Sequence, residues 1–375
     1  MDAPPIIIGS DGFDLYNNTV TFQDPNTGLL VKMDLGQGDV HIDSALSNFA
    51  TTFRPAGMVA DIVAPPVIVA RASDKFFQFD PKNTLALVDG TQVAAGADYP
   101  TISPALSNTP FQTFGYTLGC LLPTEVISNA DAPLNLPVTA VQMVQDRLLL
   151  NRENRVKTLA FNTASFVSGQ GLVINLGAAQ KWNGGSSSDP VRNIRAIREA
   201  SLMPVTHTVM DLLSWHAFTE NPAVQKYIFA KNAAAPLPGK TQYEEWGALL
   251  DIPTPVVAQA KAYNSVTNTF DFLWKGSTVL VRTPPGADLV GDNMTFKTFR
   301  WNGAGSQRIK DQPVEAGGTV TGGWIVRKFF NPYRGPQGTH TIVVTHNDAE
   351  QITGGYNPTG AVASYIGGVI VGTYQ

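Results

Sequence analysis

The sequence predicts an α+β fold, with helices in the middle of the chain and strands around them. Apolar residues recur with helical spacing between residues 137 and 163, which gives the strongest helical signal. Short apolar runs typical of strands occupy residues 19–42 and most of the chain after Thr254. Because the helical and strand signals are grouped in this way, we expect the α+β class and not an alternating α/β fold.

The first elements are two short strands, TVTF and LLVKMDL, separated by Asn and Gly residues that suit turns. Next, Pro65 and Pro66 interrupt an apolar segment. Proline lacks an N–H group and restricts the residue before it, so extended backbone is expected from Ile62 to Val69. Since this segment carries no catalytic groups, a surface arm or lacing segment is the predicted role.

Residues 80–118 are rich in turn-forming residues and almost uncharged after Asp98. A structureless loop of this length is unusual inside a compact domain. We therefore expect an extended, two-stranded excursion here.

The long helix should begin near Pro137 and run to about Thr163, a rod of roughly 40 Å at about 1.5 Å per residue. One acid and four bases crowd its middle: Arg147, Arg152, Glu153, Arg155 and Lys157. One interpretation is a solvated face with local ion pairs, each contributing under about 1 kcal/mol. The other is pairing with another subunit.

Three shorter helices are predicted after it. Asp189 and Pro190 suit an N-cap and a first helical residue, and Thr241 with Glu244 forms a capping-box pattern. Between them, residues 211–216 should form a short helix that leads to Asn221 and Pro222. The strands expected after Thr254 are PVVAQAKAY, FDFLWKGSTVLVRT, FKTFRW, WIVRKFF, THTIVVTH and YIGGVIVGTY.

Composition limits the classes of partner. The 375 residues are enough for two or three domains, or for one domain with long excursions. Charged residues make up only 15% of the chain and the net charge is -4, so much of the surface is uncharged, as in surfaces that meet other proteins. This mild acidity argues against direct electrostatic binding of a nucleic-acid backbone, which would need clustered Lys and Arg residues.

No motif points to catalysis, a cofactor or a metal. Cys120 is the only cysteine, which excludes an intrachain disulfide, and its apolar neighbours predict a buried, inert thiol. Phosphate-binding glycine motifs and nucleophile elbows do not occur, nor does an apolar run of membrane-spanning length or a signal-peptide pattern. The histidines lack ligand-pair spacing: His41, His207, His216, His340 and His346.

Several segments, in order, carry a family resemblance. Residues 60–80 contain Ala60, Asp61, Val63, Pro65 and Val69, followed by Lys75, Phe76, Phe77, Phe79 and Asp80. This pattern resembles the N-terminal part of tailed-bacteriophage major capsid proteins. FQTFGYTLG, NADAPL, the Trp182 and Ser188-Asp189-Pro190 segment, residues 209–224 and LWKG are similar to later parts of the same family. The resemblance covers roughly residues 47–301 and returns in the last strands.

The resemblance implies an HK-ninety-seven-type capsid fold. Its parts would be an N-terminal arm (1–60), an extended loop with flanking strands (61–118) and a peripheral domain with the long spine helix (119–205). An axial domain (206–345) and C-terminal strands (346–375) would follow. The Gly-rich stretch at 302–339 departs from the family pattern and is interpreted as an insertion.

The implied function is structural: a major capsid protein, not an enzyme, that self-assembles into hexamers and pentamers of an icosahedral head around double-stranded DNA. Implied partners are a separate scaffolding protein, a portal and a decoration protein, with no sequence-specific DNA binding. The chain would be a virion component assembled in the host cytoplasm. Rival interpretations are an encapsulin-type compartment shell, an α+β enzyme and a secreted carbohydrate-binding β protein.

Nine residues are candidate inter-subunit contacts: Arg54, Arg71, Lys75, Phe76, Phe77, Lys82, Arg152, Glu153 and Arg155. For the aromatic residues the alternative is ordinary core packing. Some relatives join subunits by an isopeptide bond between a loop lysine and an asparagine, assisted by a buried glutamate. By resemblance, Lys75 or Lys82 could be that lysine and Glu153 the acid, whereas a solvated surface lysine is the alternative.

Overall fold

The computed structural model describes residues 57–79, 106–130, 135–184, 187–230, 242–283, 294–301, 324–346, 349–354 and 364–374. It also describes short strands and single positions between residues 13 and 50, and positions 87, 92 and 101. The chain divides into two compact units, each built from three segments. Unit 1 is Met1–Phe53, Gly115–Asp146 and Gly303–Asn347, and unit 2 is Arg54–Phe114, Arg147–Asn302 and Asp348–Gln375.

Unit 1 contains two antiparallel sheets. One has the order β1-β2-β3, with β1 at Phe13–Asp14, β2 at Thr19–Gln23 and β3 at Leu30–Asp34, which confirms the two predicted N-terminal strands. The other has the order β4-β16-β17-β8. Its strands are β4 (His41–Ile42), β8 (Thr117–Pro123), β16 (Trp324–Asn331) and β17 (Thr339–His346), and the short helix α4 (Thr124–Ser128) follows β8.

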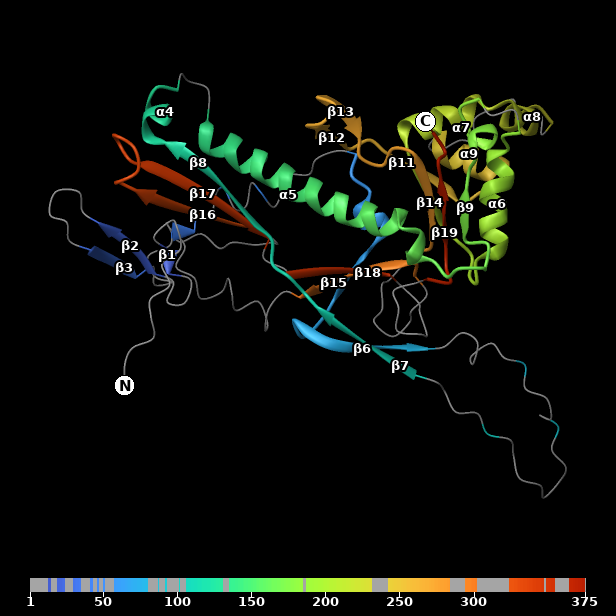
Figure 1. The fold of residues 1–375 in the computed structure, drawn as a ribbon, viewed down its shortest axis with the longest axis horizontal. Helices are drawn as coiled ribbons and strands as arrows, with labels where there is room; N and C mark the ends of the chain where they lie inside the picture. Colours follow the sequence, from blue (N-terminus) through green and yellow to red (C-terminus); the bar gives the residue numbers. More distant parts are fainter. Residues whose placement is uncertain are drawn as a thin grey trace. The chain divides into compact units, whose positions relative to one another are not determined.

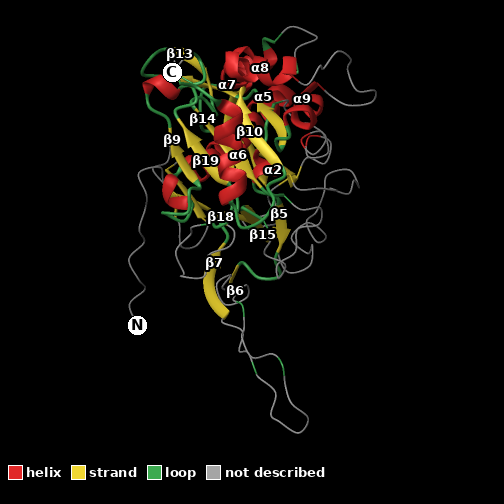
Figure 2. Cartoon of the chain, turned by 90° about the vertical axis from the view of Figure 1, so that its right-hand side faces the viewer, coloured by secondary structure: helices red, strands yellow, loops and turns green. Residues whose placement is uncertain are grey.

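Unit 2 is built on a five-stranded sheet of order β11-β10-β14-β19-β9. The β10–β11 and β9–β19 pairs are parallel, and β14 pairs with its neighbours in antiparallel fashion. Figure 2 shows helices around this sheet. The strands are β9 (Val173–Asn175), β10 (His207–Asp211), β11 (Thr254–Ala258), β14 (Ser277–Val281) and β19 (Gly368–Val371).

This sheet crosses two of the domain boundaries expected from the sequence. Strand β9 falls in the expected peripheral domain, β10, β11 and β14 in the axial domain, and β19 in the C-terminal strands. The boundaries near 205 and 345 therefore divide one hydrogen-bonded sheet, because strand pairing joins segments that are distant in sequence. The assignment of capsid domain names stays a prediction.

The predicted helices are present with small shifts at their ends (Figure 1). The long helix is α5 (Leu136–Phe161), and α6 (Pro190–Ala200) begins after Asp189, whose side chain accepts from the Arg192 N–H. The other long elements are α7 (Leu212–Glu220), α8 (Pro222–Ala230) and α9 (Gln242–Leu250). Thr241 of the predicted capping box lies outside the described residues, and α4 and α8 were not predicted.

Smaller elements complete unit 2. A three-stranded sheet has the order β18-β15-β5, formed by β18 (Ala349–Gly354), β15 (Phe296–Trp301) and β5 (Pro66–Ile68). A separate hairpin pairs β12 (Lys261–Asn264) with β13 (Thr269–Phe272). Two short 3-10 helices lie at Thr163–Ser165 and Ala178–Gln180.

Of the two-stranded excursion predicted for residues 80–118, the structure describes one strand, β7 (Leu106–Gln112), whose partner β6 (Ser73–Phe79) precedes the predicted range. The two strands pair antiparallel, from Ser73 opposite Gln112 to Phe79 opposite Leu106 (Figure 1). Most of residues 80–105 lie outside the described residues.

The Pro-Pro segment differs from its prediction. Residues Ala60–Val63 form a helical turn, α2, and the extended part is limited to β5, which pairs in parallel with β15. Proline restricts only the residue before it, so Ile62 and Val63 remain free to be helical. The segment is also not a surface arm, since Val63, Ala64, Val67 and Val69 are buried.

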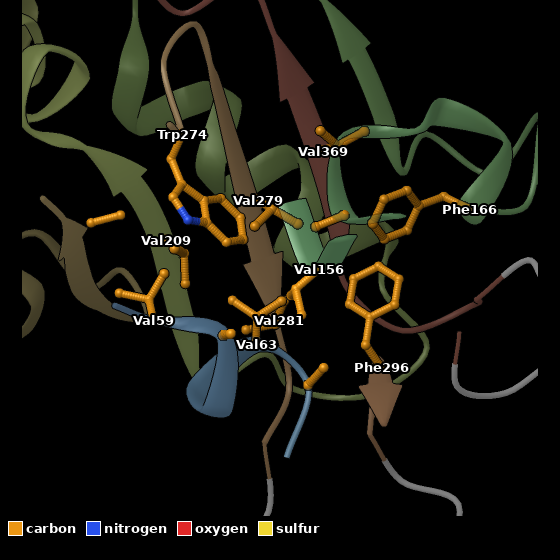
Figure 3. Close-up of a cluster of buried hydrophobic side chains, with 14 of the residues drawn as sticks. Val59, Val63, Val156, Phe166, Val209, Trp274, Val279, Val281, Phe296 and Val369 are labelled. Carbon is orange, nitrogen blue, oxygen red and sulfur yellow. The ribbon is translucent and has the colours of Figure 1, made fainter. Parts of the chain in front are cut away.

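One hydrophobic core of unit 2 joins α2, the end of α5 and the five-stranded sheet (Figure 3). Val59 and Val63 come from the α2 region, Val156 from α5, and Trp274 from the turn before β14. Figure 3 shows the Trp274 ring near Val209 and Val279 of the same core. Phe166 and Phe296 pack edge to face, with 5.7 Å between their ring centroids. The burial of Val156 in this core fixes the position of the last turns of α5, including the residues just before Val156.

The residue after α9, Asp251, adopts a left-handed conformation with φ of 52°. Glycine is preferred at this position after a helix because a Cβ atom is unfavourable there. Arg198 donates to the Asp251 carbonyl and carboxylate at 2.8 and 3.1 Å, but this ion pair is largely exposed.

Asp251→Gly is expected to raise the free energy of unfolding by roughly 0.5 kcal/mol, because relief of the left-handed strain exceeds the loss of an exposed ion pair. Chemical denaturation of both proteins measures the difference. Asp251→Ala is the control, since it loses the same ion pair and keeps the strain. A glycine variant no more stable than the alanine variant would contradict the argument.

Candidate functional site

An unusual polar site of unit 2 is centred on Glu153 of α5. This residue carries a carboxyl group but is only 1% exposed. Its Oε1 accepts from the Val59 N–H at 2.9 Å and from Trp274 Nε1 at 2.8 Å, and its Oε2 accepts from the Ala60 N–H at 3.0 Å. The first N–H groups of a helix have no partners within that helix, and α2 has no side-chain cap of its own. Glu153 therefore supplies the cap of α2 from a distant part of the chain.

Burial is the largest influence on the Glu153 carboxyl group and raises its pKa. The three donors and the neighbouring Arg152 act in the opposite direction, but the net pKa lies above the ordinary glutamate value. The native protein consequently holds this proton more tightly than the unfolded chain does.

This pKa shift predicts a pH dependence of stability. The free energy of unfolding of the wild type, minus that of Glu153→Gln, should be largest below about pH 4.5 and should decline as pH rises through the native pKa. The decline follows because the unfolded chain releases the proton first. Urea denaturation of both proteins from pH 4 to 8 measures it, and contributions from other groups cancel in the difference. A difference that grows with pH would contradict the assignment.

The neighbouring residue, Arg152, connects three further elements. Its Nε donates to Glu350 Oε2 of β18 at 3.0 Å, and its Nη2 donates to Asp61 Oδ1 of α2 at 2.8 Å. Arg300 of β15 donates through Nη2 to the second Glu350 oxygen at 2.9 Å. Burial lowers the Arg152 pKa, but Glu350 and Asp61 more than offset this and raise the net value. The guanidinium thus remains charged.

At the base of the β6–β7 hairpin, three phenylalanine rings meet. The centroids of Phe76 and Phe111 lie 5.0 and 4.4 Å from that of Phe299 in β15. Lys297 is fully buried, and its Nζ lies 4.4 Å from the centre of the Phe76 ring. Such a desolvated cation over an aromatic face is favourable, so the hairpin base is fixed by aromatic packing and a cation–π contact.

The candidate contact residues fall into three groups. Phe76, Arg152 and Glu153 are buried with partners in their own unit, so core packing describes Phe76, and the solvated-face interpretation does not fit the two α5 residues. Arg71 and Lys75 are exposed and Arg155 is half-buried. Arg54, Lys82 and the side chain of Phe77 lie outside the described residues. The inter-subunit role therefore stays a proposal for the residues on the surface.

Among the residues that the structure describes, the remaining cysteine and histidine side chains form no further site. Cys120 is half-exposed, not buried as predicted, because β8 is the edge strand of its sheet. Burial lowers the pKa of His207, and His216 is exposed. Across the described ranges, His, Cys, Asp and Glu side chains form no group of three suited to a metal ion. None of the helices that the structure describes has the length and apolar character of a membrane span.

Comparison in sequence identifies a capsid relative. No family model matches the chain. It is 26% identical over 152 residues to the major capsid protein of Pseudomonas phage JBD67, a match that covers 40% of this chain and 47% of that protein. The chain thus spans about half the length of the curated relative it matches.

Comparison in structure gives a wider match. The chain resembles a phage-related protein of Bordetella bronchiseptica RB50 with a TM-score of 0.58 and 15% identity, covering 89% of this chain and 98% of that one. Weaker similarities are to the capsid of Cyanophage P-SCSP1u (TM-score 0.48, 10% identity, 85% and 89% covered) and to the SrpI encapsulin of Synechococcus elongatus PCC 7942 (0.44, 10%, 89% and 96%).

The predicted α+β class is present in the structure, and the predicted resemblance to a phage major capsid protein reappears in the sequence comparison. The chain is similar in sequence to a phage major capsid protein, and it shares the fold of a phage-related protein.

Proposed function

We propose that this protein is the major capsid protein of a tailed phage and has a structural, non-enzymatic role. Copies would form hexamers and pentamers of an icosahedral head that encloses double-stranded DNA. The observation that carries the proposal is the 152-residue similarity to a phage major capsid protein. The fold shared with a phage-related protein over 89% of the chain supports it.

The physical basis of such a shell is the sum of many weak contacts. Once a first contact has formed between two copies, each further contact is effectively intramolecular and gains from a high local concentration. The β6–β7 hairpin suits this role, since its base is anchored in the aromatic cluster of unit 2. A separate scaffolding protein, a portal and a decoration protein are proposed as partners, with assembly in the host cytoplasm and the virion as final location.

The test is to express the full chain, fractionate it by size and image the heaviest fraction by electron microscopy. Closed angular shells are expected, alone or with the candidate scaffolding protein added. Only monomers under both conditions would contradict the proposal. Shells that carry a protein cargo from the cell instead would favour a compartment of the encapsulin type.

Lys75→Glu is expected to reduce the yield of shells several-fold without changing the melting temperature, because Lys75 is an exposed residue at the hairpin base. Lys226→Glu, an equally drastic charge reversal at an exposed position of α8, is the matched control. Light scattering during assembly measures both variants. If both charge reversals reduced the yield of shells equally, the proposed inter-subunit contact at Lys75 would be contradicted.

A further inference from the structure

The loop between the 3-10 helix Ala178–Gln180 and α6, within unit 2, carries an asparagine followed by a glycine, Asn183 and Gly184. Both residues are exposed, although Trp182 directly before them is only 1% exposed. Among the contacts of the described residues, none involves the Asn183 side chain or the Gly184 N–H. The Asn183 amide is therefore open to water and to the backbone that follows it.

The backbone before Asn183 is fixed to the core of unit 2. The Trp182 N–H donates to the Thr373 carbonyl at 3.1 Å, and the Trp182 carbonyl accepts from Asn221 Nδ2 at 3.1 Å. By contrast, Gly184 has a φ of 127°, and a Cβ atom placed on it would meet nothing within 4 Å. Because glycine has this conformational freedom, the Gly184 nitrogen can turn toward the Asn183 side chain while Trp182 stays in place.

This arrangement favours one covalent reaction, the attack of a backbone nitrogen on the preceding side-chain amide. The attack closes a five-membered ring, and it is hindered when the attacking residue carries a Cβ atom or when the backbone is held in a helix. We propose that Asn183 is a site of spontaneous modification, at which the amide is converted to isoaspartate or aspartate through a cyclic imide with Gly184.

The reaction needs water as its sole co-reactant and involves no change of oxidation state. The Gly184 N–H gives up its proton to hydroxide or water as its nitrogen bonds to Asn183 Cγ. The Cγ–Nδ2 bond breaks, and Nδ2 leaves as ammonia with a proton from water. Water then opens the ring: addition at Cγ gives aspartate, and addition at the backbone carbonyl gives isoaspartate, in which the chain runs through the side chain. Each modified chain gains one negative charge.

Three other asparagines of unit 2 show what protects such an amide. The Asn162 side chain accepts from the Ala164 N–H at 3.0 Å, and Asn221 is buried and donates to Trp182. Asn151 is exposed, as Asn183 is, but it lies inside α5 and is followed by an arginine. Backbone N–H groups inside a helix are bonded to the carbonyls four residues before, so the nitrogen after Asn151 is not free to attack. Asn151 is therefore the internal reference.

The experiment incubates the folded full chain in mildly alkaline buffer, below its unfolding transition, and digests samples with trypsin in mildly acidic buffer. Cleavage after Lys181 and Arg192 releases residues 182–192, in which Asn183 is the only amide side chain. Cleavage after Arg147 and Arg152 releases residues 148–152, which contain Asn151. Mass spectrometry should show the mass gain of an amide-to-acid conversion, increasing with time, in the first peptide and not in the second. Isoaspartyl methyltransferase should methylate the modified chain.

Two variants test the roles of the two residues. Gly184→Ala should slow the conversion of Asn183 several-fold, because the added Cβ atom crowds the attacking nitrogen. Asn183→Gln should abolish the mass gain, since its longer side chain would have to close a six-membered ring. Both positions are exposed, so near-ultraviolet circular dichroism should match that of the wild type.

A synthetic peptide of residues 182–192 in the same buffer is the reference without the fold. Conversion of this peptide without conversion of the folded chain would overturn the inference, since the fold would then protect Asn183. Equal conversion of Asn151 and Asn183 in the folded chain would overturn it as well, because neither exposure in a loop nor Gly184 would then matter. The measurement uses unassembled chains, so its outcome is independent of whether the protein forms shells.

Discussion

Replacing Glu153 by leucine is expected to lower the free energy of unfolding by about 3 to 5 kcal/mol. Three buried donors lose their acceptor at once: the N–H groups of Val59 and Ala60 and the indole N–H of Trp274. Each unsatisfied buried donor costs about 1–3 kcal/mol. The loss is only partly offset, because the fold no longer has to bury a carboxylate.

Guanidinium denaturation with tryptophan fluorescence measures this loss, and the indole of Trp274 also reports on the site directly. Glu153→Gln is the matched control, since its amide oxygen can still accept from two of the donors. Its destabilisation should be clearly smaller than that of the leucine variant. Equal losses in the two variants would show that the hydrogen bonds to Val59, Ala60 and Trp274 contribute little.

The burial of Arg152 and Glu153 differs from the solvated face that their charged stretch suggests. Arg152 lies at helical spacing between Leu148 and Val156, on the apolar face of α5. A charge at such a position has to find a buried partner. That spacing was a usable signal. The partners themselves could not be predicted, since Val59 and Glu350 lie far away in the sequence.

Local signals predicted most of the elements. Asp189 caps α6, and Val191, Ile194 and Ile197 form its buried face, because capping and amphipathic spacing act within a few residues. The helical turn α2 was missed because its cap comes from Glu153 of another element. Local sequence patterns also could not predict the order of the strands in each sheet, since this order depends on which distant segments pair. The pairing of β19 with both β14 and β9 is such a case.

The contacts of Glu350 with Arg152 and Arg300 also depend on distant pairing. In the sequence, Arg300 shares the predicted strand FKTFRW with Lys297, and Glu350 lies two residues after Asp348 in a segment for which the sequence predicted no strand. They form a pair only because β15 and β18 are antiparallel neighbours with Arg300 opposite Glu350. A register shift of one residue would point these side chains to opposite faces. The site therefore depends on sheet register.

Gly368→Ala is expected to lower the free energy of unfolding by about 3 kcal/mol or more, enough to leave little folded protein. A Cβ atom at this position would lie 2.4 Å from the Leu172 carbonyl oxygen and 2.6 Å from a methyl group of Ile197. The carbonyl cannot move freely, because it accepts the hydrogen bond that joins Val369 to Leu172 at 2.9 Å. The methyl group belongs to a fully buried side chain.

The clash therefore separates β19 either from the segment before β9, which loosens the β9 edge of the five-stranded sheet, or from α6, which loosens the packing of that helix on β19. Gly115→Ala is the control, since a Cβ atom there has nothing within 4 Å, and its unfolding should match that of the wild type. The soluble yield and the denaturation midpoint of the two variants measure the contrast. A Gly368→Ala protein as stable as Gly115→Ala would mean that β19 can shift without loss of pairing, and the close packing of α6 on this sheet would then not determine the fold of unit 2.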